Sequence, residues 1–267
     1  MSGGGGLAGA GAGMRAVVLA AGYATRLRPL TDSIAKQLLP IGGRPMMDWV
    51  CDKVEEVTAD IHVVTNSRFA ADFARWARGR DGITVHDDGT ESNDDRLGAI
   101  GDIAFVLERM DGDDDLLVIA GDNLFDFSLA GFVEFWRAKG VASAVALYDC
   151  GDLELAAHYG VVEIGENDRI VGFEEKPAEP RSTLVATATY LYHREHAALI
   201  WRYLAEGNPP DQPGRLVAWL WSREPVFGYR FEGSWFDIGN PEQLLEADNH
   251  WRERNGLPRR AEYTPSS

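Results

Sequence analysis

The sequence predicts an α/β fold in which helices cover both faces of a mostly parallel, mixed sheet. Short apolar runs typical of buried strands alternate along the chain with segments of helical periodicity. Elements that alternate in this way form a three-layer sandwich, with the sheet between two layers of helices. The chain has 267 residues, which is long enough to bury a sizeable core, and it shows no internal repeat.

Three apolar runs predict strands that are buried on both faces. They cover residues 16–21, 61–65 and 116–120, and each is only five or six residues long. Runs of this length that end at glycine or polar residues are typical of the strands of a parallel sheet.

Three further segments predict helices. Residues 46–57 place apolar side chains at helical spacing directly after Pro45, and residues 98–110 and 129–138 are also expected to be helical. Ser128 is expected to cap the last of these helices and Gly140 to end it.

We expect one domain over residues 14–253, because no linker divides the middle of the chain. Residues 1–13 are rich in Gly and Ala and predict a flexible extension that lacks the features of a signal peptide. The chain becomes polar and contains two prolines from residue 254 onward, so residues 254–267 predict a loose tail.

The composition favours a cytoplasmic protein that binds small molecules. The chain carries 42 acidic and 26 basic residues, a net charge of −16, which argues against nonspecific binding to nucleic acid or anionic membranes. No apolar run approaches the roughly 18 residues of a membrane-spanning helix. Cys51 and Cys150 are far apart and form no metal-binding pattern, so we expect free thiols in a reducing compartment.

The loop after the first predicted strand is the most informative stretch of the chain. Gly22 follows the strand, and Arg26, Arg28 and Lys36 come soon after it. Small residues at the end of a strand let main-chain N–H groups approach phosphate oxygens, and basic side chains add positive charge. The stretch lacks the later glycines of a dinucleotide-binding fingerprint and the Gly-Lys-Ser/Thr of a P-loop. It therefore predicts a site for a phosphorylated small molecule of another kind.

The same stretch resembles the opening motif of the sugar nucleotidyltransferase family, which includes glucose-1-phosphate thymidylyltransferases and other NDP-sugar pyrophosphorylases. The motif is L-A-A-G-x-G-T-R-L-x-P-x-T, followed by a lysine about ten residues later. The matching residues are Leu19, Ala20, Ala21, Gly22, Thr25, Arg26, Leu27, Pro29, Thr31, Lys36, Leu38 and Pro40. Ala24 departs from the motif where the family usually has Gly, and Ala35 departs from it where the family usually has Pro.

This resemblance implies a Rossmann-like three-layer sandwich and an enzyme that joins a nucleoside triphosphate to a sugar 1-phosphate, with release of pyrophosphate. No hexapeptide repeats follow, so no C-terminal β-helix is expected. The reaction brings two polyanions together in line, so it needs positioning and charge neutralisation more than acid–base chemistry. The implied cofactor is Mg²⁺, and the implied partners are the two small-molecule substrates.

Two aspartates are expected to bind the metal. Asp122 lies in Gly-Asp-Asn directly after the predicted strand at 116–120, and Asp237 lies in Trp-Phe-Asp-Ile-Gly. Both settings match the family's metal-binding positions, and two carboxylates together with phosphate oxygens suit Mg²⁺. The two residues are far apart in the sequence, so their pairing follows from the resemblance alone.

Three cations are expected to hold the phosphates during catalysis. Lys36 would neutralise the triphosphate side, and Arg26 would neutralise the β- and γ-phosphates. Lys176, which lies in a Glu-Lys-Pro motif, would hold the sugar phosphate. Only four of the 26 basic residues are lysines, and two of them fall at these positions.

The remaining site residues are assigned by the same resemblance. The nucleotide-binding set is Leu19, Ala20, Ala21, Gly22, Thr25, Asn93 and Gly98, and the sugar-binding set is Gly160, Glu175, Lys176 and Tyr190. An Asn side chain can donate and accept hydrogen bonds at once, so Asn93 fits a pyrimidine, and dTTP or UTP is favoured.

Other functions remain open at this point. One is a cytidylyltransferase that acts on a phosphorylated polyol or alcohol, and another is a non-catalytic relative that binds a sugar nucleotide and regulates a partner. A glycosyltransferase is disfavoured, because the chain has no Asp-x-Asp motif at this strand end. The family includes dimers and tetramers, so the sequence leaves the sugar, the base and the oligomeric state undecided.

Overall fold

The computed structural model describes residues 13–111 and 113–265. Residues 1–12 of the predicted extension therefore lie outside the described residues. The sheet strands are β1 (Met14–Leu19), β4 (Ile61–Thr65), β5 (Ile83–Asp87), β6 (Asp115–Ala120), β8 (Ser143–Asp149), β9 (Gly160–Ile164), β10 (Ile170–Glu175), β11 (Leu184–Tyr192) and β12 (Val226–Arg230). The two-stranded ribbons are β2 (Pro40–Ile41) with β3 (Arg44–Pro45), and β7 (Asn123–Phe125) with β13 (Trp235–Asp237).

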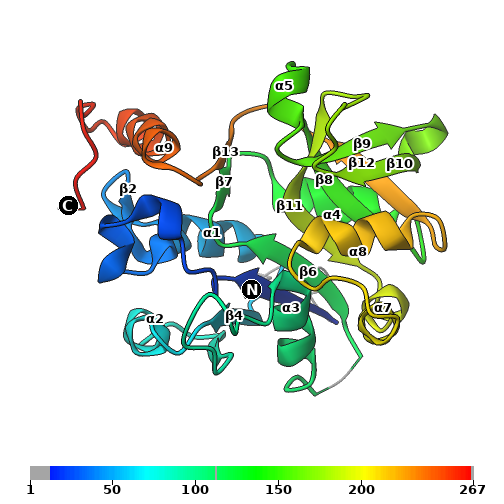
Figure 1. Ribbon diagram of the computed structural model, residues 1–267, viewed down its shortest axis with the longest axis horizontal. Coiled ribbons are helices and arrows are strands. Elements are labelled where there is room, and N and C mark those ends of the chain that lie inside the picture. The colour runs from blue at the N-terminus through cyan, green and yellow to red at the C-terminus, as the bar shows by residue number, and fades with distance from the viewer. Residues whose placement is uncertain (1–12, 112, 266–267) are drawn as a thin grey trace, which may run out of the picture.

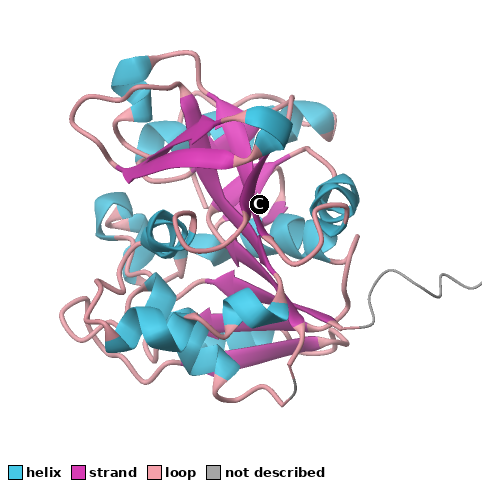
Figure 2. Cartoon of the chain, turned by 90° about the vertical axis from the view of Figure 1, so that its right-hand side faces the viewer, coloured by secondary structure: helices cyan, strands magenta, loops and turns pink. Residues whose placement is uncertain are grey.

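The helices are α1 (Met46–Val54), α2 (Ala70–Trp76), α3 (Ala99–Leu107), α4 (Leu129–Arg137), α5 (Leu153–Ala156), α6 (Arg194–Ala197), α7 (Ile200–Ala205), α8 (Pro213–Leu220) and α9 (Pro241–Arg254). Four 3₁₀ turns accompany them: η1 (Thr25–Leu27), η2 (Leu30–Asp32), η3 (Lys36–Leu38) and η4 (Glu166–Asp168). Helices lie on both faces of the sheet (Figure 1), and Figure 2 shows the strands running through the centre of the molecule. The predicted fold class is confirmed.

The first half of the sheet is parallel and positions the predicted phosphate loop. Strand β1 pairs in parallel with β4 and β6, so that Leu19 lies opposite both Val64 and Ala120. Because the strands end side by side, the loops that follow them emerge at one edge of the sheet. The carboxyl edge therefore brings together three loops that are far apart in the sequence.

The second half of the sheet is antiparallel around β11, a feature that the alternation of strands and helices did not predict. Strand β11 runs antiparallel to β6, β8 and β9, and β9 and β10 are also antiparallel. The connection between β9 and β10 contains only the short turn η4. Parallel strands need a crossover of a dozen or more residues, so a short connection imposes antiparallel pairing.

Two buried apolar clusters cover the two faces of the sheet. One packs β1 and β4 against α1, α4 and α9, and the other packs the opposite face against α3, α7 and α8. The side chains of β1 divide between them, with Ala16 and Val18 in the first cluster and Val17 and Leu19 in the second. This division explains why the strand is apolar at every position, since both of its faces are buried.

The predicted helix ends agree with the structure to within a few residues. The Ser128 hydroxyl accepts a hydrogen bond from the Gly131 N–H (3.3 Å), as expected for an N-cap. Helix α1 begins at Met46 and ends at Val54, three residues earlier than the periodicity predicts.

In the described part of the tail, which forms no helix or strand after Arg254, the main chain exchanges hydrogen bonds with polar side chains of α9. Asn249 exchanges two hydrogen bonds with the main chain of Arg260 (2.7 and 2.9 Å), and Arg252 Nε donates to the Pro258 carbonyl (2.6 Å). The Tyr263 hydroxyl donates to the Pro40 carbonyl (2.8 Å). Hydrophobic patterning does not reveal such contacts, since they join polar side chains to the main chain.

Within the described ranges, we find no helix that is both long and apolar enough to cross a membrane.

Candidate active site

A cavity of about 510 Å³ opens at the carboxyl edge of the sheet and is lined by residues from both halves. The predicted site residues that line it are Leu19, Ala21, Gly22, Asn93, Gly98, Asp122, Gly160, Glu175, Lys176, Tyr190 and Asp237. Four predicted residues lie outside this lining: Ala20, Thr25, Arg26 and Lys36.

The ribbon of β7 and β13 brings the two predicted metal ligands together. Asp237 pairs with Asn123, the neighbour of Asp122, and the Ile238 N–H donates to the Asp122 carbonyl (3.2 Å). This pairing is a tertiary contact between segments more than a hundred residues apart, which explains why spacing could not predict it.

Asn123 positions both carboxylates, a role that the sequence analysis did not assign. Its Nδ2 donates to Asp122 Oδ1 (3.0 Å) and to Asp237 Oδ1 (3.3 Å), while its Oδ1 accepts from Trp235 Nε1 (2.7 Å). The signal was present in the sequence, because Asn123 and Trp235 belong to the same two motifs as the aspartates.

The charges at this ribbon are unevenly balanced. Lys36 Nζ donates to Asp122 Oδ2 (2.5 Å) and to the Ile238 carbonyl. Burial opposes ionisation of Asp122, but the Lys36 ammonium and the hydrogen bonds from Lys36 and Asn123 outweigh it and lower its pKa. Burial and the negative charge of Asp122 raise the pKa of Asp237 to about 6, despite the nearby Lys36 and Arg26.

The residues present fit a Mg²⁺ ion. One amide reaches both carboxylates, and the repulsion that raises the pKa of Asp237 is of the kind that a bound cation relieves. The described residues contain no group of three or more His, Cys, Asp or Glu side chains suited to a metal. Mg²⁺ usually takes one or two carboxylates and completes its shell with water and substrate phosphates.

The predicted phosphate loop reaches the same cavity through Ala21 and Gly22. A Cβ at Gly22 would meet no heavy atom within 4 Å, whereas Ala20 is buried and donates its N–H to Val64 (2.8 Å). Thr25 and Arg26 are exposed on η1, and an Arg26 Nη lies 3.3 Å from where a Cβ at Gly239 would lie. Arg26 therefore lies beside the segment that carries Asp237.

Ala24 adopts a left-handed conformation (φ 44°, ψ 44°), and its carbonyl accepts a hydrogen bond from Thr31 Oγ1 (2.9 Å). This conformation favours glycine, which is the residue that the motif usually has here. The Thr31 contact fixes the loop even though an alanine occupies the strained position.

Of the two predicted base-binding residues, Gly98 directly precedes α3, whereas Asn93 lies in the exposed loop before it. Gly98 has a positive φ of 80°, and a Cβ there would lie 2.7 Å from the Pro210 carbonyl oxygen. The N–H groups of Ala99 and Ile100 donate to Asp211 and Pro210 (3.3 and 2.8 Å), so these first-turn donors already have partners. Glycine is needed at position 98 because the 210–211 segment passes so close.

Glu175 lies on the opposite side of the cavity, between two glycines. A Cβ would lie 3.1 Å from Glu175 Oε2 at Gly160 and 2.2 Å from it at Gly214. Burial raises the pKa of Glu175, although Lys176 and Arg215 counteract it. Gly214 was missed from sequence, because Pro213-Gly214 signals only the start of a helix there.

Lys176 and Tyr190 complete this side of the cavity. Lys176 is exposed, has a positive φ of 50°, and its N–H donates to the Tyr159 carbonyl (2.9 Å). Burial raises the pKa of the Tyr190 phenol well above its ordinary value, so the hydroxyl stays protonated.

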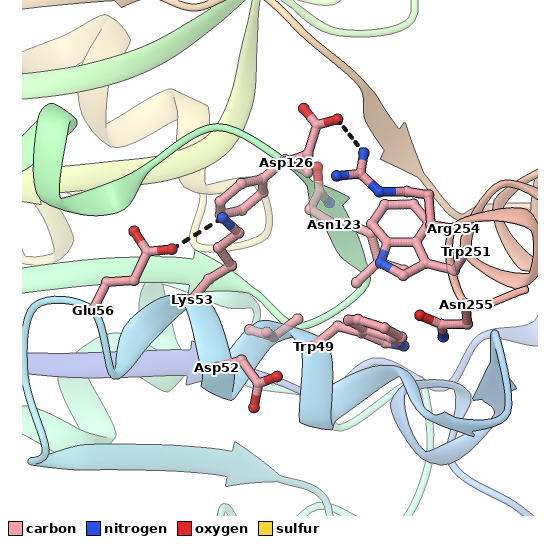
Figure 3. Close-up of a pocket in the computed structure, with 12 residues that line it drawn as sticks. Trp49, Asp52, Lys53, Glu56, Asn123, Asp126, Trp251, Arg254 and Asn255 are labelled. Carbon is pink, nitrogen blue, oxygen red and sulfur yellow. Dashed lines mark hydrogen bonds and ion pairs between the residues drawn. The ribbon is translucent and has the colours of Figure 1, made fainter.

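A second cavity, of about 370 Å³, lies between α1, β7 and α9 (Figure 3). Asn123 lines both cavities, but none of the predicted site residues lines this one. Its charged groups include two ion pairs, Lys53 with Glu56 (3.0 Å) and Arg254 with Asp126 (2.8 Å). We therefore place the candidate active site in the larger cavity.

A family model described as nucleotidyl transferase matches residues 15–254 of the chain. The chain is 30% identical over 256 residues to UTP–glucose-1-phosphate uridylyltransferase of Synechocystis, covering 91% of this chain and 63% of that protein. It is 27% identical over 238 residues to the bifunctional protein GlmU of Methanocaldococcus jannaschii, covering 89% of this chain and 54% of that protein. The chain thus spans a little over half to just under two thirds of the length of these relatives.

Solved structures show the same fold. A glucose-1-phosphate thymidylyltransferase structure from Bacillus anthracis, in complex with sucrose, superposes with a TM-score of 0.78 at 25% identity, covering 90% of this chain and 96% of that one. A UDP-glucose pyrophosphorylase complexed with UDP-glucose superposes with a TM-score of 0.76 at 20% identity. The superposition covers 90% of this chain and 99% of that one.

Proposed function

Because the chain belongs to the nucleotidyl transferase family, we propose that it transfers a nucleotidyl group from a nucleoside triphosphate to a sugar 1-phosphate. The proposed cofactor is Mg²⁺, and the favoured nucleotides are dTTP and UTP. The observation that carries the proposal is the pair Asp122 and Asp237, joined through Asn123 beside the phosphate loop and facing the cavity that Glu175 and Lys176 also line.

In the proposed reaction, a phosphate oxygen of the sugar 1-phosphate attacks the α-phosphorus of the nucleotide. The new phosphorus–oxygen bond forms as the bond to the β-phosphate oxygen breaks, and pyrophosphate leaves with the electron pair. No proton has to move, so the side chains act by positioning and by charge.

The roles divide between the two sides of the cavity. Asp122 and Asp237 would hold the Mg²⁺, whose charge would neutralise the triphosphate. Lys36 holds Asp122 ionised, and Arg26 is proposed to bind the β- and γ-phosphates. Lys176 is proposed to bind the sugar phosphate, and Glu175 with the Gly160 main chain the sugar hydroxyls.

The test is pyrophosphate release with Mg²⁺ from ATP, CTP, GTP, UTP and dTTP, each against a panel of sugar 1-phosphates and polyol phosphates. Release with UTP or dTTP and one sugar 1-phosphate is the expected result. Release only with CTP and a polyol phosphate would replace the proposal with the cytidylyltransferase alternative. If no pair of substrates releases pyrophosphate but NDP-sugars stabilise the protein against thermal unfolding, the result would instead support a regulatory relative.

A further inference from the structure

A pair of buried carboxyl groups lies at the end of the cavity where the predicted base-binding residues are found. Asp88 follows β5 and is 7% exposed, and Asp102 lies on α3 and is 6% exposed. Asp102 lines the cavity together with Asn93 and Gly98. Neither aspartate belongs to the predicted site residues.

The two carboxyls differ in the partners that they have. Asp88 Oδ1 accepts hydrogen bonds from the Thr90 N–H and hydroxyl (both 2.7 Å), and Tyr23 OH lies 3.1 Å from Thr90 Oγ1. Asp88 Oδ2 and Asp102 Oδ1 are buried without a hydrogen-bond donor. A proton shared between the two carboxyls supplies the missing donor, and Asp102 is its natural carrier because the bonds from Thr90 favour an ionised Asp88.

The electrostatics agree with this assignment. Burial, followed by the negative charge of Asp88 and the hydrogen bond to it, raises the pKa of Asp102 to about 8. Burial also raises the pKa of Asp88, against the hydrogen bonds from Thr90. Asp102 is therefore mainly a neutral acid at pH 7.

Charged groups on the surrounding elements have partners of their own. These are Arg202 with Glu206 beside α7, Arg215 with Gln212 at the start of α8, and Arg96 with Asp211 at the cavity rim. On the strands, His62 of β4 and His86 of β5 contact each other (2.8 Å), and burial lowers the pKa of both. Asp88 is the charged group that acts on Asp102.

We propose that Asp102 is a nucleobase-recognition residue that works in its neutral form, sharing its proton with Asp88. With the acidic hydrogen directed to Asp88, the remaining carboxyl oxygen accepts a hydrogen bond from a base N–H. Ionisation of Asp102 removes the hydrogen that Asp88 accepts, so that two buried carboxylates repel each other and the Asp102 oxygen loses its position toward the base. This inference rests on the proposed function, because it assigns the ligand of this cavity to a nucleoside triphosphate.

The experiment measures equilibrium binding of ATP, CTP, GTP, UTP and dTTP, and of inorganic tripolyphosphate, with Mg²⁺ between pH 6.5 and 9.5. The proteins are the wild type, Asp102→Asn and Asp88→Asn. Tripolyphosphate carries the same type of phosphate chain without a base, so it reports on the phosphate loop alone. Asn is isosteric with neutral Asp and keeps both a donor for Asp88 and a carbonyl oxygen for the base.

For the nucleotide that binds tightest, the wild type is expected to lose about tenfold in affinity between pH 7 and pH 9, since only the protonated fraction binds. Asp102→Asn should bind this nucleotide as tightly as the wild type at pH 7, and its affinity should not change at higher pH. In Asp88→Asn the loss of nucleotide affinity should begin at a lower pH, because an Asn side chain that donates a hydrogen bond favours the ionised Asp102. Tripolyphosphate affinity should be the same for the wild type and Asp102→Asn at each pH.

The inference would be overturned if the nucleotide affinity of the wild type were as independent of pH as that of Asp102→Asn. It would also be overturned if the wild type lost as much affinity for tripolyphosphate as for the nucleotide. If Asp88→Asn does not fold, the comparison of wild type with Asp102→Asn still decides the matter. Failure of the proposed function has a different signature, since no nucleotide would then bind better than tripolyphosphate at any pH.

Discussion

Asp122 shows how a single residue depends on its charged neighbours. Its carboxylate contacts Lys36 Nζ at 2.5 Å, and its neighbour Asn123 also holds Asp237. The lysine offsets the cost of burying the carboxylate, so the Asp122 side chain stays ionised. The pKa of Asp237 is nevertheless raised, because burial and the negative charge of Asp122 outweigh the positive charges of Lys36 and Arg26.

Asp122→Asn should lower kcat by about a hundredfold or more, because an amide cannot supply the charge that the proposed metal needs. The measurement is steady-state pyrophosphate release, with circular dichroism to verify the fold. Asp126→Asn is the matched control, since Asp126 follows the same ribbon strand but pairs with Arg254 instead. Near-normal turnover by Asp122→Asn would remove Asp122 from the metal site.

Asp102→Asn should raise the free energy of unfolding by up to about 5 kcal/mol at pH 8, because each unit by which the pKa is raised, roughly four in all, corresponds to about 1.4 kcal/mol. The folded-state pKa is raised, so wild-type stability is full below the unfolded pKa near 4 and falls as the pH rises toward about 8. The advantage of Asn should therefore grow from pH 4 to pH 8 and then level off. Thermal melts across this range provide the measurement, and an advantage that does not vary with pH would contradict it.

At the scale of elements, short segments at the sheet edge fix the site more than the long helices do. The ribbon of β7 and β13 brings the two aspartates together, and the start of α8 closes the cavity beside Glu175. Both contacts depend on small or polar residues at particular positions.

Gly214→Ala should displace the Glu175 carboxylate, because the new Cβ would lie 2.2 Å from Oε2. The end of a Glu side chain moves easily, so the fold should survive while KM for the sugar 1-phosphate rises about tenfold. KM for the nucleotide should stay nearly constant.

Gly131→Ala on α4 is the control, since it also places a Cβ on a helical glycine, but away from the cavity. Unchanged sugar-phosphate kinetics in Gly214→Ala would show that Glu175 does not bind the sugar.

At the scale of the whole molecule, the site lies where two halves of one sheet meet. The parallel half supplies the predicted phosphate loop and the strand before Asp122, and the antiparallel half supplies Gly160, Glu175 and Lys176. The arrangement suits a reaction with two substrates, because each half can hold one of them.

Lys176→Ala should therefore weaken binding of the sugar 1-phosphate about tenfold or more while changing nucleotide binding little. Separate titrations of each substrate by calorimetry provide the measurement. Lys139→Ala is the matched control, because Lys139 pairs with Asp168 away from the cavity. Equal losses for both substrates would move Lys176 out of the sugar side.

The sequence by itself determined the fold class, the first strands and helices, and the family. Apolar runs, caps and a motif of adjacent residues are local features, so they can be recognised without knowing what packs against them. The opening motif from Leu19 to Lys36 needed no tertiary information, and the family match over residues 15–254 agrees with it.

Only the tertiary structure decided how Asp122 meets Asp237, why Gly214 has no side chain, and that Asp88 and Asp102 share a buried site. The same holds for the hydrogen bonds between α9 and the tail and for the antiparallel pairing around β11. Each of these depends on contacts between residues distant in the chain, and composition or periodicity carries no record of such contacts. Local chemistry therefore predicted the residue types of the site, whereas packing determined which of them lie together.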